Sequence, residues 1–503
     1  MNKSNYYISS FFWSTLAKIL NAVLGFISVP LLLGYYGQIE YGILAIATAC
    51  NGYMHLLDLG MNTGAIKFFS QWETEGKQTL IYKVARTNIT FYFIIACINS
   101  LILILLAVFG ENIFSVAHEQ FIQLRICLFI IAFFSAFSWV TTAFNQLLVA
   151  DKQMAFTMQI QCVQVILKTL LIFIALWAHL SLSFYFFCFT AILASILIPY
   201  AFKCRKDNLI DSLKPSFYWK DFKIVLMFSL SIFALSLFQM TASQSRPILL
   251  SMFSYNGAET VSEFKIIEVI PQFIIMIGGT FSSIFLPKTS ELIAKKDKVL
   301  IEEFAYKWTT LTSVLANILC VPFIFCATEV ISAYVGVKFA HLSLWLILWC
   351  LTVLVQIHTT PGNALILSYG RTKLLVITSA CSCAISMLIN IILCSHYGVG
   401  SAVIGYFIYV LIVISANYLA YYKNLLGLKR WKMLSCFLIP TICSFVTLFI
   451  VSYIPIKQEW FSMFPLRLQY ICICSIKSII WIIPYLLFLS VSGIVNFKSL
   501  RIK

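Results

Sequence analysis

The sequence predicts an all-α polytopic membrane protein with about 14 transmembrane helices. Of its 503 residues, 61% are hydrophobic and only 11% are charged, whereas soluble domains are about one quarter charged. The apolar residues gather in runs of about 20, the length of helix that crosses the ~30 Å core of a bilayer. A water-soluble enzyme is excluded, because it would expose this apolar surface to water.

Fourteen apolar runs follow one another along the chain, separated by polar or basic clusters. The first run is longer than the core of a signal peptide and no small-residue cleavage site follows it, so we expect it to remain as a membrane anchor. The longest loops, 203–222 and 287–307, have about 20 residues each, which leaves no separate soluble domain. We expect one helix in each run, at residues 9–33, 41–66, 87–109, 122–149, 156–178, 182–202, 223–250, 263–286, 308–332, 343–367, 374–396, 402–422, 435–456 and 471–491.

The basic residues indicate the orientation of the helices. The termini and one alternate set of loops carry 26 Lys and Arg, whereas the other set carries only Lys338, Lys457 and Arg467. Because Lys and Arg accumulate in cytoplasmic loops, we expect both termini in the cytoplasm and an even number of helices. This topology accounts for the net charge of +16, so we expect no nucleic acid partner.

Two short internal similarities suggest a duplication. Residues 141–149 align with 359–367 at an offset of 218, and residues 30–33 align with 247–250 at an offset of 217. Parallel repeats of this kind enclose a central cavity in many transporters. We therefore expect two pseudo-symmetric six-helix lobes, 1–207 and 208–425, followed by two additional helices and a cytoplasmic tail in 426–503.

The sequence carries no signature of an enzyme or a metal site. A phosphate-binding loop, a zinc-protease motif and a nucleophile elbow are all missing. The six histidines have no metal-ligand spacing, and the 16 cysteines lie almost entirely in apolar runs, where a thiol behaves as a small hydrophobe. We expect neither a cofactor nor a bound metal. Transport would then draw on an ion gradient, the membrane potential or the substrate gradient.

Charged residues within the runs are the candidate substrate-binding residues, because a charge at the centre of a membrane helix costs about 2.5–3.5 kcal/mol. Their net charge of +2 suits an anionic ligand such as phosphate, to which Lys and Arg bind readily. Snorkelling to the interface or purely structural pairing is the alternative for each of them. The six candidates are Lys18, Asp58, Lys168, Arg246, Lys265 and Glu268.

Two pairs among these candidates have a geometric basis. Lys18 and Asp58 lie about equally deep in the first two runs, so they could form an ion pair. Lys265 and Glu268 are three residues apart and share a helix face. Polar residues in the middle of runs could hydrogen-bond sugars or simply join helices. They are Asn21, Gln159, Gln161, Gln164, Gln239, Ser243, Gln244, Gln356 and His358.

A loose motif lies between residues 30 and 77. Its members are Pro30 near the end of the first run, Gly37, Tyr41 and Gly42 in the following turn, then Asp58, Gly60 and the basic Lys67. This segment resembles the Wzx-type polysaccharide (O-antigen) flippase family of the multidrug/oligosaccharidyl-lipid/polysaccharide (MOP) exporter superfamily. Residues 145–152 and 363–373 look like later cytoplasmic helix ends of that family.

The resemblance implies a non-enzymatic transporter of the cell inner membrane, with two six-helix lobes around a cationic cavity that alternates its access. The implied substrate is an undecaprenyl-diphosphate-linked oligosaccharide repeat unit of O-antigen lipopolysaccharide or another surface polysaccharide. Membrane lipid, a coupling ion (H⁺ or Na⁺), a polysaccharide polymerase and a chain-length regulator are the implied partners. Of the candidate residues, only Asp58 carries over by motif, together with the flanking Gly60 and Lys67.

Three alternatives remain open at the level of sequence. A drug/cation antiporter of the same superfamily would share the architecture but should favour an acidic cavity. A lipid II flippase would also be basic, with fourteen helices. A membrane enzyme acting on the same glycan, such as a polysaccharide polymerase or an O-acyltransferase, is the third, although a polymerase is expected to have a large outer loop and the outer loops here are short.

Overall fold

The computed structural model describes residues 3–212, 214–295, 297–369, 372–456 and 458–491, and these residues form helices and loops without a strand. Eleven helical segments of this part are long and apolar enough to cross a membrane. One of them, Phe12–Asp58, covers most of the first predicted run and the larger part of the second. Two further runs fall on α8 (Trp219–Phe253) and α9 (Gly257–Lys295). The all-α membrane fold is confirmed, whereas the total of 14 crossings stays a prediction.

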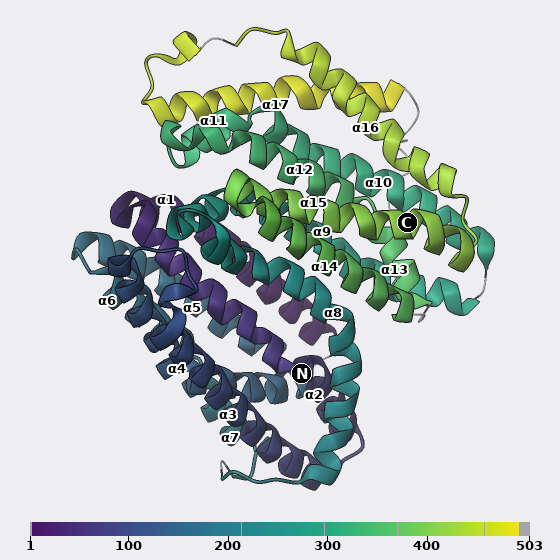
Figure 1. The fold of residues 1–503 in the computed structure, drawn as a ribbon. Helices are drawn as coiled ribbons and strands as arrows, with labels where there is room; N and C mark the ends of the chain where they lie inside the picture. The colour runs from purple at the N-terminus through teal and green to yellow at the C-terminus, as the bar shows by residue number, and fades with distance from the viewer. Residues whose placement is uncertain (1–2, 213, 296, 370–371, 457, 492–503) are drawn as a thin grey trace. The chain divides into compact units, whose positions relative to one another are not determined.

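The chain forms two compact units, Met1–Ser262 and Glu263–Lys503. In the first unit α3 and α4 run side by side, and α1 packs against α5 and α8 (Figure 1). The packing of α8 against α1, α2 and α3 places it in this unit. Besides α8, the first unit contains α1 (Lys3–Met54), α2 (Met61–Thr74), α3 (Gln78–Phe109), α4 (His118–Ala150), α5 (Met154–Trp177), α6 (Leu182–Ser195) and α7 (Leu197–Lys206).

Helix α1 contains the turn expected after the first run. Gly37 has φ 85° and ψ 173°, so the helix stops and restarts at this residue. Glycine adopts such a positive φ without the steric cost that a Cβ would bring. Tyr41 and Gly42, also expected in the turn, lie instead in the helix that follows it. A Cβ on Gly42 would lie 1.9 Å from the carbonyl oxygen of Ala258, so this glycine allows the start of α9 to touch α1.

The predicted single helix over 41–66 is wrong. Helix α1 ends at Met54, a 3-10 turn (η1) covers His55–Asp58, and α2 begins at Met61. Between them Leu59 and Gly60 both adopt the left-handed conformation, with φ 52° and 73°. Two successive residues in this conformation end a right-handed helix, and hydropathy alone does not register them.

The second unit also consists of helices packed side by side. Helix α10 packs against α12 and α16, α14 runs beside α15, and α17 packs against α11 and α16 (Figure 1). The last two predicted runs, α16 and α17, thus pack within this unit. Its helices are most of α9, α10 (Lys298–Phe325), α11 (Ala327–Tyr334), α12 (Ser343–Ile357), α13 (Thr360–Ser368), α14 (Thr372–Tyr397), α15 (Val399–Ala416), the π-helical segment η4 (Asn417–Leu425), α16 (Arg430–Ser452) and α17 (Leu466–Val491).

The predicted helix over 343–367 is also divided. Helix α12 ends at Ile357 and α13 starts at Thr360, with Pro361 in its first turn. Proline is favoured there, because its missing N–H would have no partner within the helix in any case. The expected lobes 1–207 and 208–425 are defined by a proposed duplication of the sequence. The packing of the helices does not test a duplication, so the two lobes stay predictions.

A polar cavity in the first unit

A cavity of about 380 Å³ lies in the first unit where α1 gives way to α2. A second cavity of about 390 Å³ shares His55, Trp139, Thr141 and Thr142 with it, so the two adjoin, and we call them together the polar hollow. Among the described residues that line them, none is Lys or Arg. The first cavity is lined by His55, Asp58, Asn62, Trp139, Thr141, Thr142, Asn145, Gln161, Ile196, Tyr200 and Met240.

The break between α1 and α2 shapes this hollow. Gly60 is in the left-handed conformation, and a Cβ on it would lie 2.6 Å from the carbonyl oxygen of Ser229 on α8. A Cβ on Gly64, one turn further along α2, would lie 2.0 Å from the Ser229 hydroxyl. Because both positions lack a side chain, α8 packs directly on the first turns of α2. The motif residue Gly60 is therefore required by backbone conformation and by packing.

Asp58 lies at the end of the 3-10 turn, where its carboxylate has two partners. Its Oδ2 accepts a 3.2 Å hydrogen bond from the backbone N–H of Asn62, in the first turn of α2. A carboxylate at this place satisfies an otherwise unpaired N–H and interacts favourably with the helix dipole. Its Oδ1 accepts a 2.5 Å hydrogen bond from the hydroxyl of Tyr92 on α3. The carboxylate thus joins α2 to α3 while it lines the cavity.

The hydrogen bond to Tyr92 continues into the core. The Tyr92 hydroxyl accepts from Nε2 of Gln146 at 2.6 Å, and Asn88 donates to Oε1 of Gln146 at 2.7 Å. Tyr92, Gln146 and Asn88 are each at most 1% exposed. Buried polar groups linked in this way fix one arrangement of the surrounding helices, because breaking one bond leaves several groups unpaired. The network fixes the position of Tyr92 and, through its hydrogen bond, the position of the Asp58 carboxylate in the cavity.

Aromatic and amide groups form the wall. The ring centroid of Trp139 lies 5.5 Å from that of His55 and 6.1 Å from that of Tyr92, which it stacks at an interplanar angle of 23°. Thr141, Thr142, Asn145 and Gln161 add hydroxyl and amide groups. These groups donate and accept hydrogen bonds without carrying charge. Such a lining suits a neutral, hydroxyl-rich ligand better than an apolar one.

The other predicted site residues of the first unit do not line either of these cavities. Lys168 is 9% exposed and lies on the buried face of α5, one turn from Val165 and Ile172. Arg246 on α8 is 3% exposed, and its Nε donates a 3.1 Å hydrogen bond to the carbonyl oxygen of Ala242. Lys18 is exposed, and the suggested ion pair with Asp58 is not among those of the described residues.

Lys265 and Glu268 belong to the second unit. Their side chains form an ion pair at 2.6 Å, as the shared helix face predicts.

In the first unit, the motif residue Lys67 lies on α2 with its Nζ 3.6 Å from the ring centroid of Phe228 on α8. A cation over an aromatic face is attracted by the ring quadrupole. Lys67 therefore supports the same contact between α2 and α8 that Gly60 permits.

Several cavity residues are not among the six predicted ones. His55 was expected to be structural, Gln161 belonged to the polar residues within runs, and Thr141, Thr142 and Asn145 belonged to the internal repeat. The internal repeat thus singles out Thr141, Thr142 and Asn145 in the sequence, but it indicates a duplication and not a cavity. Nothing in the sequence places Trp139 in the cavity. No group of three or more His, Cys, Asp or Glu in the described ranges could hold a metal ion.

The comparisons with known proteins agree with this architecture. Residues 8–287, more than half of the chain, match the family described as polysaccharide biosynthesis protein. The chain belongs to this family. The resemblance inferred from Asp58, Gly60 and Lys67 is therefore confirmed at the level of the family. No curated protein sequence matches the chain significantly.

Several solved structures of transporters have a similar fold. The chain is similar to the lipid II flippase MurJ in an inward closed conformation, with a TM-score of 0.72 at 17% identity over 97% of this chain and 98% of that one. It is also similar to an inward-facing multidrug resistance MATE family transporter of the MOP superfamily, with a TM-score of 0.62 at 11% identity over 84% and 96%. The Vibrio cholerae MATE transporter VcmN gives a TM-score of 0.58 at 14% identity over 85% and 99%.

Proposed function

We propose that this protein is a flippase that moves undecaprenyl-diphosphate-linked oligosaccharide repeat units from the cytoplasmic to the outer leaflet of the cell inner membrane by alternating access. The observation that carries the proposal is the hydroxyl- and amide-lined hollow beside Trp139, within the membrane-spanning part of a polysaccharide biosynthesis protein. The MurJ-like fold supports a transporter, and MurJ itself is named as a flippase of a lipid-linked molecule.

A flippase must provide a polar path by which the charged diphosphate and the sugars cross the hydrocarbon core of the bilayer. Moving an isolated ionised group into a medium of low dielectric constant costs on the order of 20 kcal/mol by idealised solvation estimates. A sugar hydroxyl without a hydrogen-bond partner adds a further cost. In our proposal Thr141, Thr142 and Asn145 hydrogen-bond the glycan, while the lipid tail remains in the bilayer through a lateral opening.

The diphosphate needs cations, which the lining of this hollow does not supply. We propose that Lys18, Lys168 and Arg246 bind it at successive depths, with Asp58 as a further polar contact in the same unit. In the second unit the Lys265–Glu268 pair is proposed as a separate substrate contact. Lys168 and Arg246 are buried in the first unit, at 9% and 3% exposure, where burial strengthens their attraction for an anion. A gradient of H⁺ or Na⁺ would drive the cycle, and a polymerase and chain-length regulator would take over the product.

One observation favours a second candidate. Asp58 and His55 are the side chains lining the hollow that can carry a charge near neutral pH, and they lie beside the aromatic ring of Trp139. An acid in an aromatic pocket suits an organic cation, as a drug/cation antiporter requires, and MATE transporters share the fold. Lipid II, the substrate named for MurJ, remains the alternative within lipid-linked substrates.

Reconstitution distinguishes these substrates. Proteoliposomes containing the purified chain would be loaded with a fluorescent lipid-diphosphate oligosaccharide, with lipid II, or with a fluorescent organic cation. We expect movement of the oligosaccharide lipid between leaflets, and its loss in a Trp139→Ala variant but not in a control Trp177→Ala variant, whose side chain is 84% exposed. Uptake of the cation without movement of either lipid would support the antiporter and contradict the flippase.

A further inference from the structure

A basic pocket lies near the start of α3, in the segment that follows α7. After α7 the chain continues as a loop, which we call the strap (residues 207–212 and 214–218), and its described residues contact the start of α3. The Thr87 and Thr90 hydroxyls accept hydrogen bonds from the backbone N–H groups of Tyr218 and Ser216 at 3.0 and 3.1 Å. Tyr82 donates to the carbonyl oxygen of Asn208 at 2.8 Å. These bonds, made at several points, hold the strap against α3.

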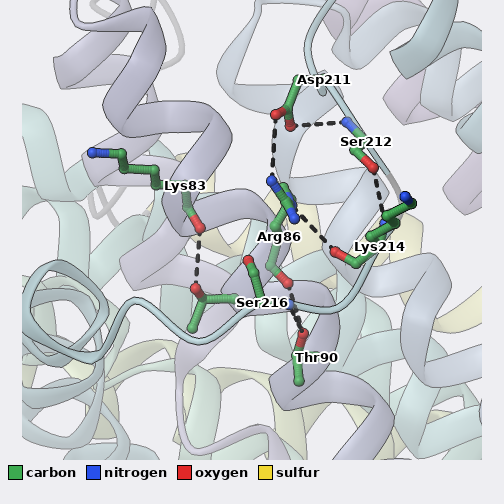
Figure 2. A network of polar contacts seen from close by, with 8 residues as sticks. Lys83, Arg86, Thr90, Asp211, Ser212, Lys214 and Ser216 are labelled. Carbon is green, nitrogen blue, oxygen red and sulfur yellow. Dashed lines mark hydrogen bonds and ion pairs between the residues drawn. The ribbon is translucent and has the colours of Figure 1, made fainter.

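Arg86 is the central contact of the strap. Its Nε donates to the carbonyl oxygen of Lys214 at 3.2 Å, and its guanidinium lies 3.5 Å from the carboxylate of Asp211 (Figure 2). Asp211 also accepts a 2.8 Å hydrogen bond from the backbone N–H of Ser212, and the Ser212 hydroxyl accepts from the backbone N–H of Lys214 at 3.2 Å. The guanidinium of Arg86 thereby balances the negative charge that Asp211 would otherwise present.

A pocket of about 470 Å³ opens on the strap, lined by Arg205, Ile210, Asp211, Ser212, Lys214 and Pro215. Arg205 and Lys214 are exposed, and neither forms an ion pair with another residue in the described part of the chain. The nearby Lys203 is neutralised by Asp207, at 2.8 Å. Since Arg86 balances Asp211, the pocket retains two positive charges for an anion.

Aromatic side chains follow the pocket residues in sequence, at the end of the strap. Phe217 is 66% exposed and Trp219 45% exposed, and their rings stack 5.7 Å apart at an interplanar angle of 7°. Tyr218 lies between them in sequence, with Nζ of Lys83 5.7 Å from its ring centroid. Trp and Tyr are enriched at the level of lipid headgroups, where one part of the ring contacts hydrocarbon and another contacts water. An exposed aromatic group that directly follows the pocket residues is therefore typical of a segment at the level of the lipid headgroups.

We infer that the strap pocket binds the phosphate headgroup of an anionic phospholipid, with Arg205 and Lys214 on the phosphate and Phe217 and Trp219 against the upper part of the acyl chains. The strap belongs to the basic loops that the sequence predicts to be cytoplasmic, and the cytoplasmic leaflet carries anionic lipids. A soluble anion would use the two cations but would gain nothing from the exposed aromatic pair. The site is separate from the polar hollow, so the inference does not rest on the transported substrate.

Native mass spectrometry of the purified full-length chain, titrated with phosphatidylglycerol or phosphatidylcholine, tests the site. An Arg205→Gln/Lys214→Gln variant should bind phosphatidylglycerol about 30-fold more weakly, since each basic residue near a lipid surface contributes about 1 kcal/mol. Phosphatidylcholine binding should not change. A matched Lys423→Gln/Lys429→Gln variant, which loses two exposed charges from another basic loop, should retain the affinity of the wild type.

Two further arms complete the test. A variant that exchanges the cations, Arg205→Lys/Lys214→Arg, should bind phosphatidylglycerol as the wild type does, and thermal unfolding in detergent should show that all variants are folded. Equal losses in both glutamine variants would overturn the inference, because they would indicate attraction by overall charge. Displacement of phosphatidylglycerol by millimolar inorganic phosphate would also overturn it, because the pocket would then be a site for a soluble anion.

Discussion

The hydroxyl of Tyr92 donates a 2.5 Å hydrogen bond to Oδ1 of Asp58, joining a residue in the middle of the core of the first unit to the carboxylate in its polar hollow. The same carboxylate accepts from the backbone N–H of Asn62 at the start of α2. Asp58 is therefore held from two sides, and the orientation of its charge is determined by the fold. A ligand in the hollow meets a carboxylate that is already positioned.

Removal of the Tyr92 hydroxyl should loosen this arrangement. A Tyr92→Phe variant leaves one oxygen of Asp58 and the Nε2 of Gln146 without this partner, and we expect a loss of about 2 kcal/mol in the free energy of unfolding. Transport should fall as well, because Asp58 and α2 lose their connection to α3. Thermal unfolding in detergent and transport in proteoliposomes measure the two effects. A Tyr82→Phe variant, which loses a more exposed hydrogen bond to Asn208, is the control, and equal effects of both changes would refute the account.

The packing of α2 on α8 can be tested with two glycines that flank the same helix. Gly60 and Gly76 both have positive φ, 73° and 70°. A Cβ on Gly60 meets the backbone of Ser229 at 2.6 Å, whereas a Cβ on Gly76 has nothing within 4 Å. Gly76→Ala should cost about 1–2 kcal/mol in unfolding free energy from conformation alone. Gly60→Ala should cost about 1–3 kcal/mol more because of overpacking. Equal losses would mean that the close approach is not required.

The aromatic wall should matter for ligand binding separately from folding. A Trp139→Phe variant retains an aromatic ring, so we expect a folded protein with oligosaccharide affinity within a few-fold of the wild type. Trp139→Leu retains apolar volume but removes the flat ring, and we expect binding to weaken about tenfold, the equivalent of one aromatic contact of about 1.4 kcal/mol. Titration of the purified variants with a soluble fragment of the oligosaccharide measures this difference. Equal affinities of the Phe and Leu variants would exclude a specific role for the ring.

Asp207, just beyond the end of α7, should contribute to the loss of folding stability at low pH. Lys203 at 2.8 Å and Gln153 at 2.6 Å donate hydrogen bonds to its carboxylate and hold the pKa of that group below its ordinary value. A group with a lowered pKa stabilises the fold above its unfolded-state pKa, and this contribution is lost as the pH falls through the folded-state value, below about pH 4. We expect Asp207→Asn to flatten the dependence of the melting temperature on pH in this range. The effect should be small, because solvent screens the pair. Parallel curves for variant and wild type would contradict the assignment.

The two buried cations of the first unit give the most direct mutational test of the proposed diphosphate contacts. Lys168→Glu and Arg246→Glu should each abolish export of the surface polysaccharide while protein abundance in the membrane remains normal. Lys168→Arg should retain activity if only the charge is needed. Immunoblotting of membranes together with an assay of surface polymer measures both quantities. Full export in both charge-reversed variants would refute the electrostatic assignment.

Much of the fold follows from the sequence because hydropathy and turn-forming glycines act locally. The turn at Gly37 is predicted, and Gly37 has a positive φ; Gly60, which also has a positive φ, is predicted only as a motif residue within a continuous run. The interruptions at His55–Gly60 and at His358–Thr359 divide runs that are each predicted as one helix, although Pro361, just after the second interruption, is a helix-disrupting residue. Both lie inside continuous apolar runs, and an apolar run has the same hydropathy whether or not its helix is divided.

The site was harder to predict, since charge within the membrane identifies costly residues but not their neighbours. Of the six candidates, Asp58 lines the hollow, whereas Lys168 and Arg246 are buried elsewhere in the first unit. Trp139 is 5% exposed and lies in the middle of an apolar helix, where it looks like any core aromatic. Its place in the wall depends on His55 and Tyr92, which come from other elements, and that meeting is a property of the fold.

The location of the lipid-linked repeat units in cells that lack the gene tests the central proposal most directly. The units would be assayed by leaflet, together with total surface polysaccharide, with and without complementation by the wild-type chain. We predict that the units accumulate on the cytoplasmic leaflet, that surface polymer is lost, and that complementation reverses both. Units that reach the outer leaflet normally in the deletion strain would contradict a flippase. They would indicate a polymerase if they stayed unpolymerised, and a drug exporter if surface polymer were unchanged.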